Sequence, residues 1–390
     1  MPDVHAKLSA SGAKKWLNCP GSIVLEAQIP EVESDYAKGG TTAHALGEAK
    51  IRLATKEVTR AKYHKAIKDL EITEDMEQYT DDYRDFVIER FNLAKSVTPD
   101  ATLLLEQRLD YSQWAPGGFG TGDVVIIADG TIEIIDLKYG KGVEVEAEDN
   151  PQLKLYALGA LTAFDYLYDI KSITMTIYQP RMDNISSCEM LVEDLLEWAN
   201  TEVVPRAKKA DSDTEEFCTG KHCEEGFCNA RPICRAYAEK QLEAAVYDFK
   251  LPSALSVDEI ADILEQAESL AKWATLIKDY ALDQAVNHGV TYPGYKIVEG
   301  RSNRAWSVDD TLVAAQLIGK GYRDDDIWPR KLKGITAMEQ LLSKKTFKDI
   351  LGDLVIKPQG KPTLVPFDDK RPEINSTDNA NKDFTGLIEN

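Results

Sequence analysis

Four mostly hydrophobic stretches in the first half of the chain are separated by polar segments, and their residue types predict β-strands. The expected strands are rich in Val, Ile and Thr and cover residues 102–111, 121–128, 131–138 and 172–180. Apolar residues at helical spacing predict helices around them, over residues 41–55, 75–95, 150–164 and 191–209. Strands that alternate with helices indicate an α/β fold.

Capping residues suggest where two of these helices begin. Asn150 is a natural N-cap, and Pro151 suits the first helical position because a missing N–H costs nothing there. Thr41 and Thr42 are expected to cap the first helix, after a loop formed by Gly39–Gly40.

The second half of the chain is nearly all helical in pattern. One long helix is expected from Ser256 to His288, followed by a short strand at 295–300 and more helices up to about residue 352. The polar last residues are expected to be disordered. The resulting division is an N-terminal domain over 1–245, a mostly helical C-terminal domain over 246–372 and a tail over 373–390.

Charge and composition exclude several classes of protein. The 390 residues contain 46 Lys and Arg against 66 Asp and Glu, a formal net charge of −20. This balance argues against a protein that grips nucleic acid over its whole surface, because such binding needs many cations. No apolar run approaches the ~20 residues of a membrane-spanning helix, and the N-terminus lacks the apolar stretch of a secretory signal. We therefore expect a cytoplasmic protein, in a bacterial host if a phage encodes it, with no membrane partner.

Four of the six cysteines lie in one short segment. It spans residues 218–234 and reads CTGKHCEEGFCNARPIC. In a reducing compartment, clustered cysteines more often bind metal or perform redox chemistry than form disulfides. The segment therefore indicates a metal or cluster loop.

A predicted hairpin holds the most informative residues. Asp129–Gly130 between two β-rich runs is a strong turn signal. With these two residues as the loop, Val125 faces Ile134, and side chains at every second position share a face. The apolar side chains of that face would form a buried floor.

Two carboxylates and an amine are expected at the open end of this floor. The same count places Asp123 opposite Asp136, with Lys138 on the same face. Opposed carboxylates repel unless something compensates them, and a hard divalent cation such as Mg²⁺ or Mn²⁺ would do so. The alternative interpretation is the polar end of an ordinary hairpin with a surface Asp–Lys pair.

Two expected helices each carry a pair of polar residues whose members are four positions apart. His44 and Glu48 share one helical face, and so do Gln152 and Tyr156. An imidazole is a ligand for transition metals and is accepted by Mn²⁺. The alternatives are that His44 is a structural histidine and that Gln152 and Tyr156 only pack against their surroundings.

Taken together, these motifs resemble the PD-(D/E)XK nuclease superfamily, and within it the RecB/AddB-type branch that includes the iron–sulfur nucleases of CRISPR adaptation. The likeness covers roughly residues 8–240 and rests on Gly40-Thr41-x-x-His44-x-x-x-Glu48, Gly122-Asp123, Asp136-Leu137-Lys138 and Gln152-x-x-x-Tyr156. It implies a restriction-endonuclease-like core with a central mixed β-sheet flanked by helices. It also implies functional residues in this chain: a metal held by His44, Asp123, Asp136 and the carbonyl of Leu137, the catalytic Lys138, the helix motif Gln152 and Tyr156, and the acidic Glu48.

The same resemblance implies a [4Fe–4S] cluster. Its ligands would be Cys19, Cys223, Cys228 and Cys234. The gap between Cys223 and Cys228 departs from the usual spacing, which leaves Cys218 as a possible substitute ligand. A zinc site that uses His222 is the alternative, although a local zinc loop would not need Cys19. Cys188 is expected to be a buried thiol.

The wider chain, including residues 331–372, resembles a family of phage and prophage proteins with this nuclease core and a helical extension. The combined prediction is a metal-dependent DNA nuclease that hydrolyses phosphodiester bonds. Family analogy favours an exonuclease of phage DNA recombination or replication, with DNA and a recombination or single-strand annealing protein as partners. A non-hydrolytic protein that binds DNA ends, or a recombination scaffold, is the alternative, and a zinc-ribbon interaction protein is a third.

Overall fold

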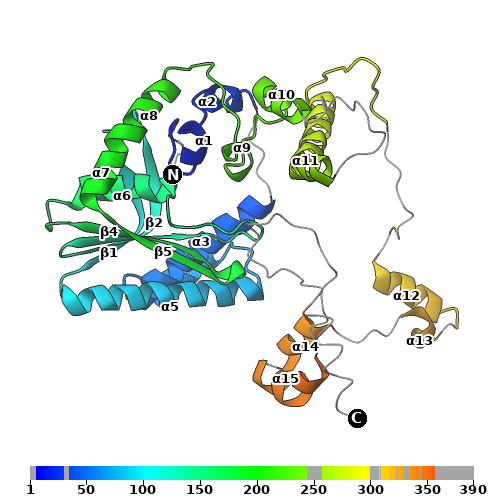
Figure 1. Cartoon of the computed structure of the whole chain (residues 1–390). Helices are drawn as coiled ribbons and strands as arrows, with labels where there is room; N and C mark the ends of the chain where they lie inside the picture. Colours follow the sequence, from blue (N-terminus) through cyan, green and yellow to red (C-terminus); the bar gives the residue numbers. More distant parts are fainter. Residues whose placement is uncertain are drawn as a thin grey trace, which may run out of the picture. The chain divides into compact units, whose positions relative to one another are not determined.

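The computed structural model describes residues 6–29, 35–243, 257–298, 307, 309–321, 323–328, 334–342 and 344–355. The chain divides into two compact units, Met1–Gln284 and Ala285–Asn390, and the first contains the β-sheet (Figure 1). The expected domain boundary near residue 245 and the expected tail over 373–390 lie outside the described residues.

A five-stranded mixed sheet forms the centre of the first unit. Its strands follow the chain order: β1 (Thr102–Asp110), β2 (Phe119–Ala128), β3 (Thr131–Leu137), β4 (Ser172–Gln179) and β5 (Asn184–Leu191). The β3–β4 pair is parallel and the other pairs are antiparallel. The four expected strands are present, and the α/β prediction of a mixed sheet flanked by helices with a mostly helical extension is confirmed.

The fifth strand was not among the expected ones. Along β5 half-buried and exposed residues alternate, and no residue is fully buried. Its sequence, NISSCEML, includes Asn, Ser and Glu, which are poor strand formers. Pairing with β4, rather than local propensity, therefore stabilises the strand conformation of these residues.

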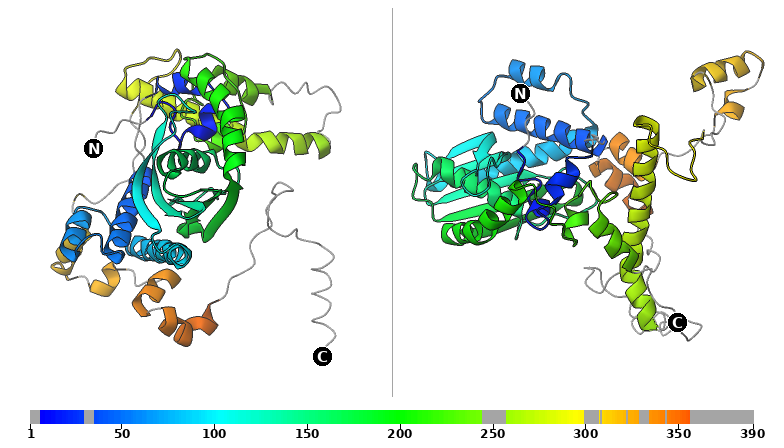
Figure 2. Two further views of the ribbon diagram at one scale, coloured as in Figure 1. Left: turned by 90° about the vertical axis from the view of Figure 1, so that its left-hand side faces the viewer. Right: turned by 90° about the horizontal axis from the view of Figure 1, so that it is seen from above.

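Helices cover both faces of the sheet (Figure 1), and the views in Figure 2 show the layers from two other sides. On one face α6 (Pro151–Phe164) packs on buried side chains of β2 and β3. On the other, α3 (Asp35–Ala54) and α5 (Glu74–Val97) contribute Ile51, Tyr83 and Val87 to a second core. The expected catalytic and metal-binding residues lie on α3, on α6, in β2 and at the end of β3.

The expected start of the first helix at Thr41–Thr42 is wrong. The helix begins at Asp35 and continues through Gly39 and Gly40. The Thr42 hydroxyl donates to the Lys38 carbonyl, as a helix-interior threonine does, and does not cap. Burial of Ala43 and Leu46 against Met76 holds this helix, so packing outweighs the loop preference of the two glycines.

The expected start of α6 is confirmed. Asn150 Oδ1 accepts from the backbone N–H groups of Gln152 (3.1 Å) and Leu153 (3.4 Å), and Pro151 occupies the first turn. Farther along, Gly159 allows the helix to approach β1 closely: a Cβ there would lie 2.8 Å from the Leu109 Cβ. These features fix α6 against the sheet.

The remaining elements are short, apart from one long helix. In the first unit they are α1 (Ala13–Trp16), α2 (Ser22–Glu26), α4 (Arg60–Ile67), η1 (Pro180–Met182), α7 (Val192–Trp198), the π-helical η2 (Ala199–Val203), α8 (Val204–Asp211), α9 (His222–Glu225) and α10 (Arg235–Glu243). The long helix α11 (Val257–Asn287) matches the expected one and ends just before Gly289, which has φ +71°.

The described residues of the second unit from 309 onward are mostly helical, whereas residues 289–298 form turns and loops. The helices are α12 (Asp310–Ile318), α13 (Asp324–Ile327), α14 (Ile335–Leu342), α15 (Lys344–Leu351) and η4 (Gly352–Leu354). The expected strand at 295–300 is wrong for residues 295–298, and its last two residues lie outside the described ones. Among the helices described, none has the length and apolar character needed to cross a membrane.

Candidate active site

The β2–β3 hairpin has the predicted register. Val125 pairs with Ile134, and Ala128 pairs with Thr131 across the turn. The inward-facing side chains of both strands are fully buried and form the floor: Val125, Ile127, Ile132 and Ile134. The turn chemistry of Asp129–Gly130 therefore sets which side chains lie together at the open end of the hairpin.

Asp123 and Asp136 both lie at that end. One oxygen of Asp123, Oδ2, accepts from the backbone N–H of Leu137 at 2.7 Å. Asp136 is only 3% exposed. Burial raises the pKa of Asp136, the Lys138 ammonium opposes the rise, and the Asp123 carboxylate adds to it.

Lys138 and the α6 residues surround the Asp136 carboxylate. Lys138 Nζ lies 2.9 Å from Asp136 Oδ2 and donates to Gln152 Oε1 at 3.0 Å. The Gln152 amide donates to Asp136 Oδ1 at 3.2 Å and to the Tyr156 hydroxyl at 3.1 Å. The structure thus brings these four expected residues into one network, in which each side chain restrains the next.

His44 reaches the site from α3. Its Nδ1 lies 3.1 Å from Asp123 Oδ1. Burial alone would lower the pKa of His44, but the charge and hydrogen bond of Asp123, with the charges of Asp136 and Glu106, raise it to about 9. Both oxygens of Asp123 are therefore oriented, one by a backbone N–H and one by an imidazole.

Glu106 of β1 completes this group and was not expected from the sequence. The neighbouring pairs Leu105–Val124 and Gln107–Gly122 place it directly opposite Asp123. Its φ of 50° is unusual for a residue other than glycine. The ligand atoms of His44, Glu106 and Asp123 all lie within 4.8 Å of one another. Loss of hydration raises the pKa of Glu106 to about 7, and the Asp123 and Glu48 carboxylates contribute.

Three expected site residues lie beside this group. Glu48 lines the same pocket, but its Oε1 accepts from Arg52 Nε at 2.7 Å, within α3. Asp136 is close enough to His44 to influence its pKa, yet the group of three ligand atoms does not include it. Leu137 lines the pocket and contributes its backbone N–H to Asp123.

The donors present suit a hard or borderline divalent cation. Carboxylate oxygens are the usual ligands of Mg²⁺ and Mn²⁺, and one imidazole shifts the preference toward Mn²⁺. A cation at this position would offset the repulsion between Asp123 and Glu106, which now face each other across two strands.

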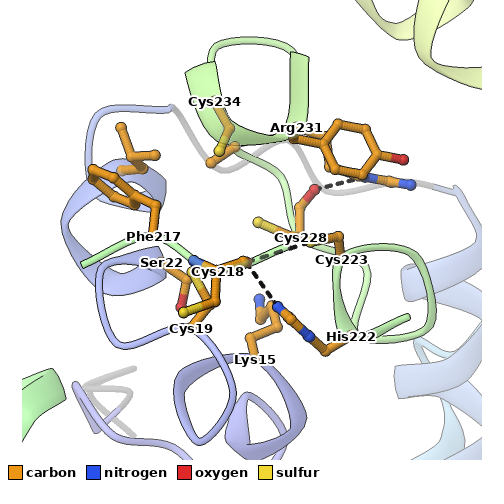
Figure 3. Close-up of a pocket in the computed structure, with 13 residues that line it drawn as sticks. Lys15, Cys19, Ser22, Phe217, Cys218, His222, Cys223, Cys228, Arg231 and Cys234 are labelled. Carbon is orange, nitrogen blue, oxygen red and sulfur yellow. Dashed lines mark hydrogen bonds between the residues drawn. The ribbon is translucent and has the colours of Figure 1, made fainter. Parts of the chain in front are cut away.

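A second cavity gathers the cysteines (Figure 3). Five of the six cysteines line it together with His222: Cys19, Cys218, Cys223, Cys228 and Cys234. Cys19 follows α1, whereas the others lie around α9 and just before α10. The backbone N–H of Cys218 contacts Cys19 Sγ at 3.3 Å, which ties the two segments together.

The cavity disfavours free thiolates. Burial raises the pKa of Cys228 to about 12 and also raises the pKa of Cys223. Thiolates in such a site need a bound cation or cluster to offset their charge. The structure places all four expected ligands and Cys218 here, and His222 Nε2 lies 3.0 Å from the Cys218 carbonyl oxygen. Cys188 lies elsewhere and is half-buried rather than buried, with Sγ 3.3 Å from the Ala147 carbonyl.

Comparison with known proteins gives one family match. Residues 5–372 match the family described as "Protein of unknown function (DUF2800)". Among solved structures, a candidate exonuclease from Eubacterium rectale is 11% identical, with a TM-score of 0.31, and the match covers 65% of this chain and 92% of that one. The protein SSO0001 is 14% identical, with a TM-score of 0.21 and coverage of 56% and 95%. At these scores the likeness does not establish a shared fold.

Proposed function

The chain belongs to the DUF2800 family, and we propose that it is a divalent-metal-dependent deoxyribonuclease that hydrolyses phosphodiester bonds. The observation that carries the proposal is the pair of facing groups at the end of the β2–β3 hairpin. On one side His44 and Asp123 present metal-binding atoms, and on the other Asp136 holds Lys138 at 2.9 Å. A binding protein has no need for carboxylates where phosphate must arrive, because they repel it.

His44, Asp123 and Asp136, with the Leu137 carbonyl, would hold Mg²⁺ or Mn²⁺. Such a cation, when bound, lowers the pKa of a water molecule and stabilises charge on a phosphate. Each protein group has a separate task. The Leu137 N–H and His44 orient Asp123, and Gln152 keeps Asp136 in place.

Lys138 would serve as the cationic group beside the phosphate. Burial lowers the pKa of its ammonium, but Asp136 outweighs that effect and raises it, so Lys138 stays protonated. A protonated lysine donates hydrogen bonds to a phosphate oxygen or to the attacking water, and it does not accept the proton. The Gln152 carbonyl oxygen, 3.0 Å from Nζ, restricts the direction in which the ammonium points.

The acidity of the chain gives the cation a second role. With a formal net charge of −20, the chain as a whole repels DNA. A bound dication offsets the carboxylate charge locally. DNA binding should therefore depend on the metal, and recruitment by a recombination or single-strand annealing protein would fit the same charge. Action from DNA ends, in phage recombination or replication, rests on the resemblance in the motifs.

We further propose a [4Fe–4S] cluster in the cysteine cavity. Cys19, Cys223, Cys228 and Cys234 would be its ligands, with Cys218 as a replacement for Cys223. The five thiols around one cavity support this assignment, as does the contribution of Cys19 from a segment distant in sequence. A cluster there would fasten the N-terminal helices to the segment that follows the sheet. Zinc bound by the same thiols and His222 is the alternative.

An assay on labelled single- and double-stranded DNA tests the nuclease proposal. Purified protein should degrade DNA with Mn²⁺ or Mg²⁺ and should not do so with a chelator, whereas Asp136→Ala should stay folded and inactive. Equal degradation by wild type and variant would overturn the proposal. Retarded DNA mobility without cleavage in any divalent metal would favour the non-hydrolytic end-binding protein instead. A covalently closed circular substrate separates exonuclease from endonuclease action.

A further inference from the structure

A small pocket on the α3 side of Asp123 contains more polar groups than the motifs account for. Its lining includes the three close ligand-bearing residues His44, Glu106 and Asp123, together with Glu48 and Tyr83. Of these, Glu106 and Tyr83 belong to no motif of the sequence. They come from β1 and α5, which are separate from the elements that hold Asp136 and Lys138.

The Tyr83 hydroxyl is buried without a hydrogen bond. The residue is 2% exposed, and its hydroxyl oxygen has no partner in the part of the chain that the structure describes. Buried hydroxyl groups are nearly always paired, with protein or with ordered water, because an unpaired one loses the hydrogen bonds that water gave it. An unpaired hydroxyl that lines a pocket of metal-binding atoms therefore points to a ligand in the pocket.

The phenol of Tyr83 is suited to donate. Burial raises its pKa well above the ordinary value, and the Asp123, Asp136 and Glu106 carboxylates contribute, so the proton stays on the oxygen. Its ring packs against Gly47 of α3, where a Cβ would lie 3.1 Å away, and against Tyr178 at a centroid distance of 5.3 Å. The ring is therefore fixed between α3 and the sheet.

Glu106 and Asp136 differ in what their carboxylates contact. Asp136 has Lys138 2.9 Å from one oxygen and Gln152 3.2 Å from the other. Glu106 instead has a ligand atom within 4.8 Å of both His44 and Asp123. Of the two carboxylates, Glu106 is thus the one already grouped with an imidazole and a second carboxylate.

We infer that Glu106 is a ligand of the divalent cation, and that the Tyr83 hydroxyl is a positioning group that donates a hydrogen bond to a water or carboxylate oxygen of the cation's shell. The inference rests on the proposed function, because it refines the cation site of the nuclease. Glu106 then joins His44, Asp123 and Asp136 as a ligand, and Asp136, whose buried Oδ2 also has no hydrogen-bond partner among the described residues, holds Lys138 as well. Outer-shell partners of this kind commonly change metal affinity by about 10- to 100-fold.

Mn²⁺ binding without DNA tests this assignment, for example by the EPR signal of free Mn²⁺. Glu106→Gln should weaken Mn²⁺ binding at least tenfold, and Tyr83→Phe should weaken it by about tenfold. Glu89→Gln, which removes an exposed carboxylate of α5, and Tyr166→Phe, at a site 80% exposed, are matched controls and should bind like wild type. Unchanged Mn²⁺ binding by Glu106→Gln would overturn the inference.

Tyr83→Phe has a second readout that a merely structural tyrosine would not give. In chelator, removal of an unpaired buried hydroxyl should raise the melting temperature, whereas the rise in melting temperature on adding Mn²⁺ should shrink. Loss of stability in chelator together with an unchanged Mn²⁺ effect would contradict the positioning role.

The two proposals fail in different ways. If wild type binds Mn²⁺ and Glu106→Gln binds it equally well, only the assignment of Glu106 is wrong. If wild type binds Mn²⁺ through Glu106 but cuts no DNA, the nuclease proposal fails and the cation site stands. If wild type binds no Mn²⁺, both are wrong.

Discussion

The Asp123 carboxylate accepts a hydrogen bond from the backbone N–H of Leu137 at 2.7 Å. At the point where the β2–β3 ladder ends, a side chain of β2 thus accepts the hydrogen bond in place of a backbone carbonyl. The last backbone pair is Val124 with Ile135. Beyond it, the second oxygen of Asp123 is left to face His44 at 3.1 Å. Strand pairing itself therefore orients the carboxylate on which the proposed metal site depends.

Replacement of Lys138 should separate catalysis from metal binding. Lys138→Met removes the ammonium beside Asp136, and cleavage of DNA should fall by about 10²- to 10³-fold, the usual effect of losing one charge-stabilising group. Mn²⁺ affinity should not fall, because the substitution removes the positive charge of the lysine ammonium, which would repel the metal ion. Lys171→Met, at an exposed site, is the control. Weaker Mn²⁺ binding with unchanged turnover at saturating metal would contradict the assigned role.

Metal binding should strengthen as pH rises from about 6 to 9. In the metal-free protein the pKa of His44 is about 9 and that of Glu106 about 7, so a cation must displace protons from both. Titration calorimetry in two buffers of different ionisation enthalpy should detect the released protons. Affinity independent of pH, with no proton release, would show that these two groups are not ligands.

In the metal-free protein, His44 contributes a stability that decreases as pH rises, whereas metal affinity increases. Its folded pKa lies above the ordinary value of 6.5, so the pairing with Asp123 stabilises the fold fully below pH 6.5 and is lost as pH rises through about 9. In chelator, the free energy of unfolding lost by His44→Gln should thus be larger at pH 6 than at pH 9.5. Denaturant titrations at the two pH values measure it, and an equal loss at both would be inconsistent with the Asp123 pairing.

The cysteine cavity predicts a coloured protein when purified without oxygen. A [4Fe–4S] cluster absorbs at about 400 nm because of iron–sulfur charge transfer. Cys19→Ala should lose this absorbance, whereas Cys188→Ala should keep it, because Cys188 lies outside the cavity. A colourless protein that contains one zinc per chain would contradict the cluster and support the zinc site.

Two glycine substitutions should change stability in opposite directions. Gly159→Ala brings a methyl group within 3.1 Å of the Leu109 carbonyl carbon and the Asp110 nitrogen, so overpacking should lower the free energy of unfolding by about 1–3 kcal/mol. Gly39→Ala, within α3 and with open space around it, should raise it by about 0.5–1 kcal/mol. Urea denaturation compares both, and a stabilised Gly159→Ala would refute the close packing of α6 on β1.

Local sequence signals were sufficient for one half of the site. The turn residues Asp129–Gly130 fix the hairpin register, and hence the positions of Asp123 and Asp136. The cap Asn150 fixes the start of α6, and hence the face that presents Gln152. In both cases the determining residues lie close in sequence to those that they position, so no knowledge of the tertiary structure was needed.

The parts that were missed depend on contacts distant in sequence. Glu106 lies beside Asp123 only because β1 pairs with β2 in one register, and the loop between these strands, residues 111–118, is too long for its Pro116–Gly117 turn to set that register. Likewise, α3 extends over Gly39–Gly40 because its later turns are buried. Strand β5 is defined by β4 rather than by its own residues.

The most direct test of the account compares two Asp→Asn substitutions on one hairpin in a Mn²⁺-dependent DNA cleavage assay. Asp129→Asn lies in the turn, where Asn before Gly is as favourable as Asp, and it should cleave like wild type. Asp123→Asn lies at the site and removes a ligand charge, so it should lower cleavage at least 10²-fold while the fold persists. Equal cleavage by Asp123→Asn and wild type would contradict the proposal that this hairpin end is a nuclease active site.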